Sequence, residues 1–177
     1  MIKIYIGKSA AGKDYFCKKD IKKGFAPIVS YTTRPMRKGE VNGIDYNFVS
    51  FMKFTELILN KELIEYRSYE TCVGGKPDIW YYGTPKIKDF SKNYVVVVDI
   101  DGAKAILKEY PKECRIIYIE ADEKIRTQRA KQRGSFDESE WKRRLADDDI
   151  KFSKEKLEEL QFLYGKDIKV IANNEEI

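Results

Sequence analysis

The stretch Gly7-Lys8-Ser9-Ala10-Ala11-Gly12-Lys13-Asp14 decides how this chain folds. It follows a short alternating apolar run, residues 2–6, and it opens a segment, residues 14–23, that contains no helix breaker. A strand, a glycine-rich loop, a lysine and a helix in this order are the context of a phosphate-binding loop. Glycines let successive backbone N–H groups turn toward an anion, and the helix N-terminus adds positive potential. The spacing therefore predicts a nucleotide site in which Lys13 reaches the outer phosphates, with a chance glycine turn as the alternative.

The loop departs from the usual pattern at Asp14, where a serine or threonine normally gives its hydroxyl to Mg²⁺. Mg²⁺ accepts hard oxygen ligands, so a carboxylate at this position can bear on the metal directly or through a water. The alternative is a carboxylate that faces solvent and stabilises the helix dipole. We expect the first of these.

The composition predicts a soluble single domain, because 36% of the 177 residues are charged and the net charge is +5. The longest dense apolar run, residues 94–98, is too short for a membrane span, and residues 1–4 do not begin a secretory signal, so a cytoplasmic protein is expected. Cys17, Cys72 and Cys114 are odd in number and widely spaced, which predicts reduced thiols. The absence of histidine excludes His-based triads and His-ligated zinc. The basic excess suits an anionic partner, and no nucleic-acid motif is present, so we expect small nucleotides.

The remaining pattern alternates strands with helices. Strands are expected over residues 26–30, 94–99, 115–120 and 168–172, and helices over 101–110, 122–133 and 137–163, the last as one long helix or a broken one. Such alternation predicts an α/β fold with a parallel sheet of about five strands, right-handed crossovers and helices on both faces.

Residues 31–85 are predicted to form a small β-rich insert. A strand over 46–49 is followed by Ser50, an expected N-cap for a helix over 51–60. Residues 62–69 alternate, and a turn at 74–77 separates them from a second strand, which predicts a hairpin with a long tip.

The segment Ser30-Tyr-Thr-Thr-Arg34-Pro-Met-Arg37 and its continuation to Ser50 are rich in groups that bind phosphate. For the two arginines alone, a solvated basic loop would be the default explanation. The whole segment, however, closely resembles the GMP-binding segment of guanylate kinases. Later blocks resemble that family in the same order: residues 63–66, 82–84 and 98–101, Arg129, Arg133-Gly134, Arg144-Leu145 and residues 171–174.

The resemblance implies a three-layer P-loop kinase fold that transfers a phosphoryl group from ATP, with Mg²⁺, to GMP or dGMP. The single domain, residues 1–177, would have a core of residues 1–30, 86–121 and 149–177, a GMP-binding subdomain of residues 31–85 and a lid of about residues 122–148. No nucleic acid and no membrane would be involved.

The resemblance also assigns site residues. Those implied to face guanine are Ser30, Glu65, Thr84 and Asp101, because carboxylates accept guanine's N–H groups and hydroxyls donate to O6. Those implied to hold the GMP phosphate are Arg34, Arg37, Tyr46 and Tyr82, although the tyrosines could equally be core aromatics. Those implied to bind ATP are Gly7, Ser9, Ala10, Ala11, Gly12, Lys13, Asp14 and Asn173. Lys13 and the lid arginines Arg129, Arg133 and Arg144 would act on the transferring phosphoryl group, and Asp14 and Asp99, the latter through water, would serve Mg²⁺. Singly, an exposed carboxylate or a surface arginine pair is the ordinary explanation for several of these residues.

Two features depart from the family. The chain between Glu65 and Tyr82 is longer than usual, which places an inserted tip, residues 71–80, beside the expected GMP site. The sequence also ends at Ile177, after the last expected strand, where the family has a further helix. Two other functions stay open: a module that binds phosphorylated protein ligands without chemistry, and a kinase for another nucleoside monophosphate or a phosphorylated sugar. The phosphate loop and the lid arginines favour the guanylate kinase.

Overall fold

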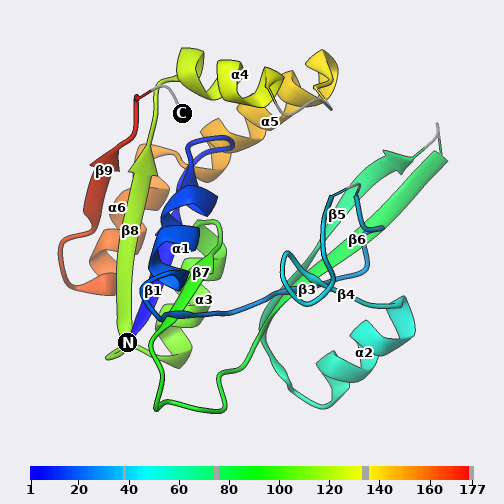
Figure 1. Ribbon diagram of the computed structural model, residues 1–177, viewed down its shortest axis with the longest axis vertical. Coiled ribbons are helices and arrows are strands. Elements are labelled where there is room, and N and C mark those ends of the chain that lie inside the picture. The colour runs from blue at the N-terminus through cyan, green and yellow to red at the C-terminus, as the bar shows by residue number, and fades with distance from the viewer. Residues whose placement is uncertain (38, 74–75, 133–135, 176–177) are drawn as a thin grey trace. The chain divides into compact units, whose positions relative to one another are not determined.

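The computed structural model of the chain describes residues 1–37, 39–73, 76–132 and 136–175 (Figure 1). The chain forms two compact units. Unit 1 comprises Met1–Pro27 and Lys92–Ile177, and unit 2 comprises Ile28–Ser91. Each unit has its own sheet, and the loop Gly7 to Asp14 belongs to unit 1.

Unit 1 is built on a five-stranded sheet in the order β2-β7-β1-β8-β9. The strands are β1 (Ile2–Ile6), β2 (Ala26–Pro27), β7 (Tyr94–Val97), β8 (Cys114–Glu120) and β9 (Lys169–Ala172). Every neighbouring pair is parallel. The predicted parallel sheet of about five strands is therefore confirmed.

Helices cover both faces of this sheet. On one face, α1 (Lys13–Ile21) packs its Phe16 and Cys17 against Tyr5 and Ile119. On the other face lie α3 (Ile100–Glu109) and α6 (Lys154–Tyr164), which contact each other. Here the Tyr164 hydroxyl donates to the backbone oxygen of Cys114 at 3.3 Å. The result is the expected three-layer arrangement.

The expected helix over residues 137–163 is broken into two. The helix α5 (Glu138–Lys151) ends before Ser153, whose hydroxyl accepts from the Lys156 N–H at 3.4 Å and so caps α6. A serine in this position ends one helix and starts the next because it satisfies an N–H group that has no partner within the helix. The helix α4 (Glu123–Lys131) precedes α5 in unit 1.

Unit 2 contains a four-stranded sheet in the order β4-β3-β6-β5 and one helix. Its elements are β3 (Tyr31–Thr32), β4 (Asn47–Phe48), α2 (Phe51–Leu59), β5 (Leu63–Val73) and β6 (Lys76–Pro85). Ser50 caps α2 as predicted, and the hairpin β5-β6 is present. Gly83 packs under α2, because a Cβ there would lie 2.7 Å from Leu63 and 3.1 Å from Phe54.

The single strand expected over residues 26–30 is wrong. Ala26–Pro27 pairs with β7 in unit 1, whereas Tyr31–Thr32 pairs with β4 and β6 in unit 2. The chain passes from one unit to the other at Pro27 and Ile28, and residues 28–30 belong to no strand.

Burial raises the pKa of the thiols of Cys17 and Cys114 to about 11, so both stay protonated at neutral pH. Neither is in a disulfide, as predicted. The side chain of Cys72 lies outside the described residues. No helix in the described part of the chain has the length and apolar character that crossing a membrane requires.

Candidate phosphate-binding site

Two glycines give the phosphate loop its shape. Gly7 has a φ of 148°, and a Cβ there would lie 2.3 Å from the backbone oxygen of Ile119. Gly12 has a φ of 100°, and a Cβ there would lie 2.3 Å from the amide nitrogen of Asn173. Side chains are excluded at both positions by conformation and by space. Between them, Ala10 adopts a φ of 58°, a left-handed conformation that costs a non-glycine residue about 1 kcal/mol.

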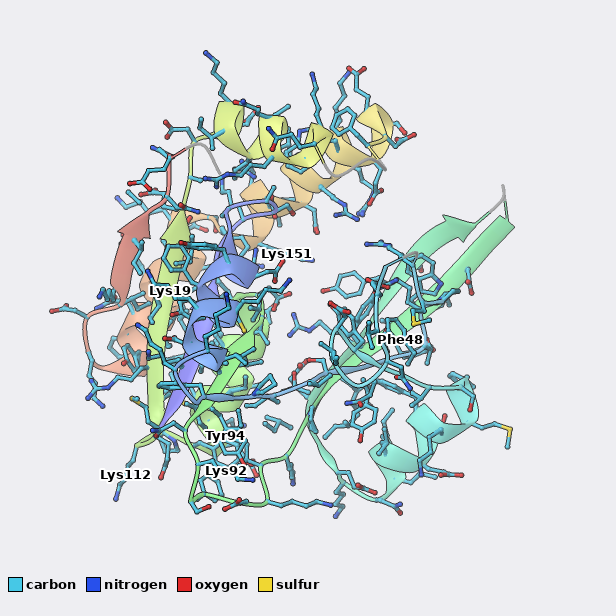
Figure 2. All side chains as sticks on the ribbon, in the orientation of Figure 1. Lys19, Phe48, Lys92, Tyr94, Lys112 and Lys151 are labelled. Carbon is cyan, nitrogen blue, oxygen red and sulfur yellow. The ribbon has the colours of Figure 1, made fainter. Side chains whose placement is uncertain are left out.

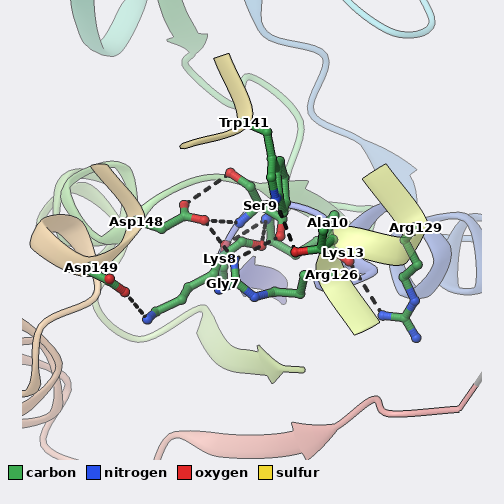
Figure 3. Close-up of polar contacts among 11 residues, drawn as sticks. Gly7, Lys8, Ser9, Ala10, Lys13, Arg126, Arg129, Trp141, Asp148 and Asp149 are labelled. Atoms are coloured by element: carbon green, nitrogen blue, oxygen red, sulfur yellow. Dashed lines mark hydrogen bonds and ion pairs between the residues drawn. The ribbon is translucent and has the colours of Figure 1, made fainter. Parts of the chain in front are cut away.

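The carbonyl oxygens of the loop are held by cationic side chains, which Figure 3 draws, and by one amide side chain. The Lys13 ammonium donates to the oxygens of Gly7 at 2.6 Å and Lys8 at 2.9 Å. The Asn173 amide donates to the oxygen of Ala11 at 2.7 Å, and Arg126 donates to that of Ser9 at 3.3 Å. With its carbonyl groups fixed in this way, the loop keeps the curvature that directs N–H groups toward an anion.

The N-terminus of α1 is open. Its N-cap, Gly12, provides no side-chain hydrogen bond, and the backbone N–H groups of Ala10 and Gly12 donate to no group among the described residues. The first turn of a helix leaves its N–H groups without intrahelical partners and carries positive potential. This arrangement of loop and helix has the N–H groups and the positive potential that an anionic group such as a phosphate needs.

A buried ion pair that the sequence did not predict supports the loop. Arg126 of α4 and Asp148 of α5 are 2% and 5% exposed, and Arg126 Nη1 lies 3.0 Å from Asp148 Oδ2. The Asp148 carboxylate accepts from the Ser9 N–H at 2.8 Å and from its hydroxyl at 3.1 Å. Beside it, Lys8 forms an exposed pair with Asp149 at 2.6 Å.

Arg129 holds the loop against the segment after β9. Its guanidinium donates to the backbone oxygens of Ala11 at 3.2 Å, Asn173 at 2.9 Å and Glu175 at 2.7 Å. Burial lowers the pKa of this guanidinium from its ordinary value. Arg129 and Asn173 therefore both bind the backbone oxygen of Ala11 in the loop. Asn173 is 7% exposed. The expected contact of Asn173 with adenine stays a prediction.

Of the two other predicted lid arginines, the structure describes only Arg144. Arg144 lies on α5, where its Nε donates to Glu140 at 2.8 Å. Arg143 binds the same carboxylate at 2.7 and 2.9 Å, and these hydrogen bonds, first from Arg143 and then from Arg144, lower the pKa of Glu140 to about 2. Arg133 lies outside the described residues.

The acidic candidates of unit 1 lie at helix starts. Asp14 is exposed in the first turn of α1, and Asp101 is exposed in the first turn of α3. Asp99 caps α3, because its Oδ1 accepts from the Gly102 N–H at 3.0 Å. Within the described residues, no three Asp, Glu, Cys or His side chains group as a metal cage. Such a cage is not needed for Mg²⁺ that is bound largely by phosphates and water.

In unit 2, Glu65 and Thr84 lie opposite each other on β5 and β6. The Thr84 hydroxyl donates to Glu65 Oε1 at 2.6 Å. A third residue, Arg67, was missed by the sequence reasoning: its Nε and Nη2 both lie 3.1 Å from Glu65 Oε2. Thr84 is 1% exposed and Glu65 is half-buried. The hydrogen bonds from Thr84 and Arg67 fix the orientation of the Glu65 carboxylate.

The basic segment of unit 2 is organised around Arg34, which is 4% exposed. Its two terminal nitrogens bind the Glu40 carboxylate at 2.8 and 3.0 Å, and this hydrogen bonding lowers the pKa of Glu40. The guanidinium also lies 5.4 Å from the ring centres of Tyr46 and Phe48, the latter labelled in Figure 2. Glu40 was a further residue that the sequence reasoning missed.

Three other candidates flank this segment. Arg37 is exposed, and its N–H donates to Glu40 at 2.7 Å. Tyr82 packs edge-on against Tyr46, with ring centres 5.9 Å apart. Ser30 is half-buried, and its backbone oxygen accepts from the Asn47 N–H at 2.8 Å.

Comparison with known proteins places this arrangement in a family. The guanylate kinase family model matches residues 2–167 of the chain. The chain belongs to the guanylate kinase family. A guanylate kinase of Clostridioides difficile is 30% identical over 182 residues, which cover 97% of this chain and 83% of the relative.

Other guanylate kinases share a smaller part. That of Symbiobacterium thermophilum is 33% identical over 81% of this chain and 68% of its own length. That of Mesoplasma florum is 38% identical over 58% of this chain, and the match spans only 33% of the relative. The chain therefore spans from a third to about two thirds of the length of these two relatives and of the guanylate kinase of Carboxydothermus hydrogenoformans, which is 31% identical over 76% of this chain and 66% of its own length. A crystal structure of guanylate kinase from Anaplasma phagocytophilum shares the fold, with a TM-score of 0.63 and 23% identity over 99% of this chain and 77% of that one.

Proposed function

We propose that this chain catalyses the ATP-dependent phosphorylation of GMP or dGMP to GDP or dGDP. The observation that carries the proposal is the phosphate loop: its shape is imposed by Gly7 and Gly12, its carbonyl groups are fixed from outside, and it opens onto an uncapped helix. Membership of the guanylate kinase family supplies the reaction class.

In this proposal the chain contributes positioning and charge. The N–H groups at the loop and at the start of α1 bind the ATP phosphates, and Lys13 turns from the loop oxygens to the transferring group. The lid, about residues 122–148, brings Arg133 and Arg144 to the negative charge of the transferring phosphoryl group. Arg129 acts on the same group while it holds the backbone of the loop. A general base is not required, because the acceptor phosphate is already anionic. Lid closure excludes water.

Mg²⁺ would be held beside the ATP phosphates, where it neutralises charge on the phosphate oxygens. The exposed carboxylate of Asp14, one residue after Lys13, has the hard oxygen donors that this ion accepts. Asp99 is assigned a more distant contact through water.

Unit 2 contributes the residues proposed to bind GMP, except for Asp101, which lies in the first turn of α3 in unit 1, and residues 31–85 are proposed as the acceptor subdomain. Glu65 would accept from the N–H groups of guanine, with Thr84, Ser30 and Asp101 completing the edge. Arg34, Arg37, Tyr46 and Tyr82 would hold the phosphate, and the Arg34–Glu40 pair keeps the guanidinium plane fixed.

An assay of ADP release with a panel of acceptors tests the function. GMP and dGMP are expected to give a kcat/KM at least about a hundredfold above that of AMP, because adenine would leave the buried polar groups of the site unpaired. Equal turnover of AMP and GMP would contradict the guanine assignment. ADP release with another nucleoside monophosphate or a phosphorylated sugar alone would identify a different acceptor. ATP binding without ADP release for any acceptor would favour the binding module.

The metal role of Asp14 has its own test. Asp14→Ala is expected to raise the Mg²⁺ concentration needed for half-maximal rate, because a hard ligand is lost, whereas Asp14→Ser supplies the usual hydroxyl and should retain activity. Titration of the initial rate with Mg²⁺ at fixed ATP measures both. If neither variant changes the Mg²⁺ dependence, the carboxylate serves only the dipole of α1. If Asp14→Ser creates activity in an inactive parent, Asp14 is a disabling change.

A further inference from the structure

We propose that Arg126 and Asp148 are a positioning pair that holds the phosphate loop and fixes the two ends of the lid. This inference rests on the proposed role of the loop in ATP binding. The pair engages all three polar groups of one loop residue, Ser9: Asp148 accepts from its N–H at 2.8 Å and its hydroxyl at 3.1 Å, and Arg126 donates to its carbonyl at 3.3 Å (Figure 3).

The place of the pair in the fold gives it this role. Arg126 lies in the first turn of α4, and Asp148 lies in the last turn of α5, so the pair joins the two ends of the proposed lid. Trp141 of α5 also donates its Nε1 to the Thr127 hydroxyl of α4 at 3.1 Å. The ends of the lid are thereby tied to each other and to the loop.

The loop needs such support because the residue after Ser9 is strained. Ala10 has a φ of 58°, and a non-glycine residue keeps this conformation only when its surroundings impose it. The Arg126–Asp148 pair fixes the backbone on one side of Ala10, and Arg129 and Asn173 fix it on the other side at Ala11. Without the pair, Ala10 is expected to relax and turn its N–H away from the phosphates.

The test separates positioning from stability. Removing one partner of a buried pair leaves an unpaired charge, so Asp148→Asn and Arg126→Leu should both lower the unfolding midpoint, whereas Arg126→Leu with Asp148→Ala removes both charges and should recover much of it. Direct calorimetric titration with Mg²⁺ and ATP, without any acceptor, should give a Kd raised about tenfold in all three variants, which corresponds to about 1.4 kcal/mol. At saturating ATP, kcat should fall by a smaller factor than ATP affinity does, since the pair does not touch the reacting atoms.

A second buried carboxylate of unit 1, which is paired with a partly exposed lysine, provides the matched control. Asp20 is 4% exposed and accepts from Lys3 Nζ at 2.9 Å and from the Tyr5 hydroxyl at 2.7 Å, at the end of α1 away from the loop. Asp20→Asn should lower the unfolding midpoint as Asp148→Asn does and leave the Kd for ATP unchanged. The proposal is overturned if the double variant binds ATP like the parent, or if Asp20→Asn weakens ATP binding equally. A parent that binds ATP but phosphorylates no GMP would refute the proposed function and leave this comparison intact. A parent that binds no ATP would refute both.

Discussion

Replacing Lys13 with methionine is expected to lower kcat for phosphoryl transfer by about a hundredfold to a thousandfold, the loss that follows removal of one preorganised donor to transition-state charge. The structure places the ammonium at the centre of the loop, 2.6 Å from the Gly7 oxygen and 2.9 Å from the Lys8 oxygen. Methionine keeps the length of the side chain and removes its charge. Single-turnover rates at saturating ATP and GMP measure the chemical step directly.

Lys8→Met is the control for this variant. Lys8 belongs to the same loop, and its pair with Asp149 has side chains that are 27% and 67% exposed. Exposed pairs contribute little, about 1 kcal/mol or less, so kcat should change by no more than about threefold. Equal losses in the two variants would show that the loop responds to total charge. A fully active Lys13→Met variant would remove Lys13 from the catalytic machinery.

Local patterns predicted the elements well, because their causes lie within a few residues. Three local patterns each predict one element correctly: the glycine loop before α1, the Ser50 cap of α2 and the run of valines in β7. The errors fall where tertiary context decides. Residues 26–30 read as one strand, yet only Ala26 and Pro27 pair with β7, and the chain then leaves that sheet and joins the other at Tyr31. The charged run over residues 137–163 is compatible with one long helix or a broken one, and the capping bond of Ser153 shows that it is broken.

The supporting residues of the site were harder to predict. Asp148 is 139 residues from Ser9, and in a chain with 29 acidic and 34 basic residues no local signal selects it as the partner of Arg126. Arg67 is different. It lies two residues after Glu65 on a strand, and alternate residues of a strand share a face. The alternation of side chains along β5 therefore places Glu65 and Arg67 on the same face of the sheet, where they can form an ion pair.

Arg67 and Thr84 together hold the Glu65 carboxylate. Oε1 of the Glu65 carboxylate accepts a hydrogen bond from the Thr84 hydroxyl at 2.6 Å, and Oε2 accepts from Arg67 at 3.1 Å. These hydrogen bonds fix the plane of the carboxylate. Each carboxylate oxygen has two lone pairs, so the two Arg67 donors fill Oε2, the Thr84 hydroxyl takes one lone pair of Oε1, and the other is left for an N–H group of guanine. The competing explanation is that Glu65 is only the internal partner of these two residues.

Glu65→Gln decides between these explanations. If Glu65 reads guanine, the amide turns part of the acceptor edge into a donor, and the cost of about 1–3 kcal/mol for an unsatisfied buried group lowers kcat/KM for GMP by roughly fivefold to 150-fold. The ratio of GMP to AMP turnover should fall with it. Arg67→Met keeps the carboxylate and frees its plane, so KM for GMP should rise by about threefold while the ratio is retained. Unchanged GMP kinetics in Glu65→Gln, together with a lowered unfolding midpoint, would show that Glu65 serves only Arg67 and Thr84 and that the acceptor is read elsewhere.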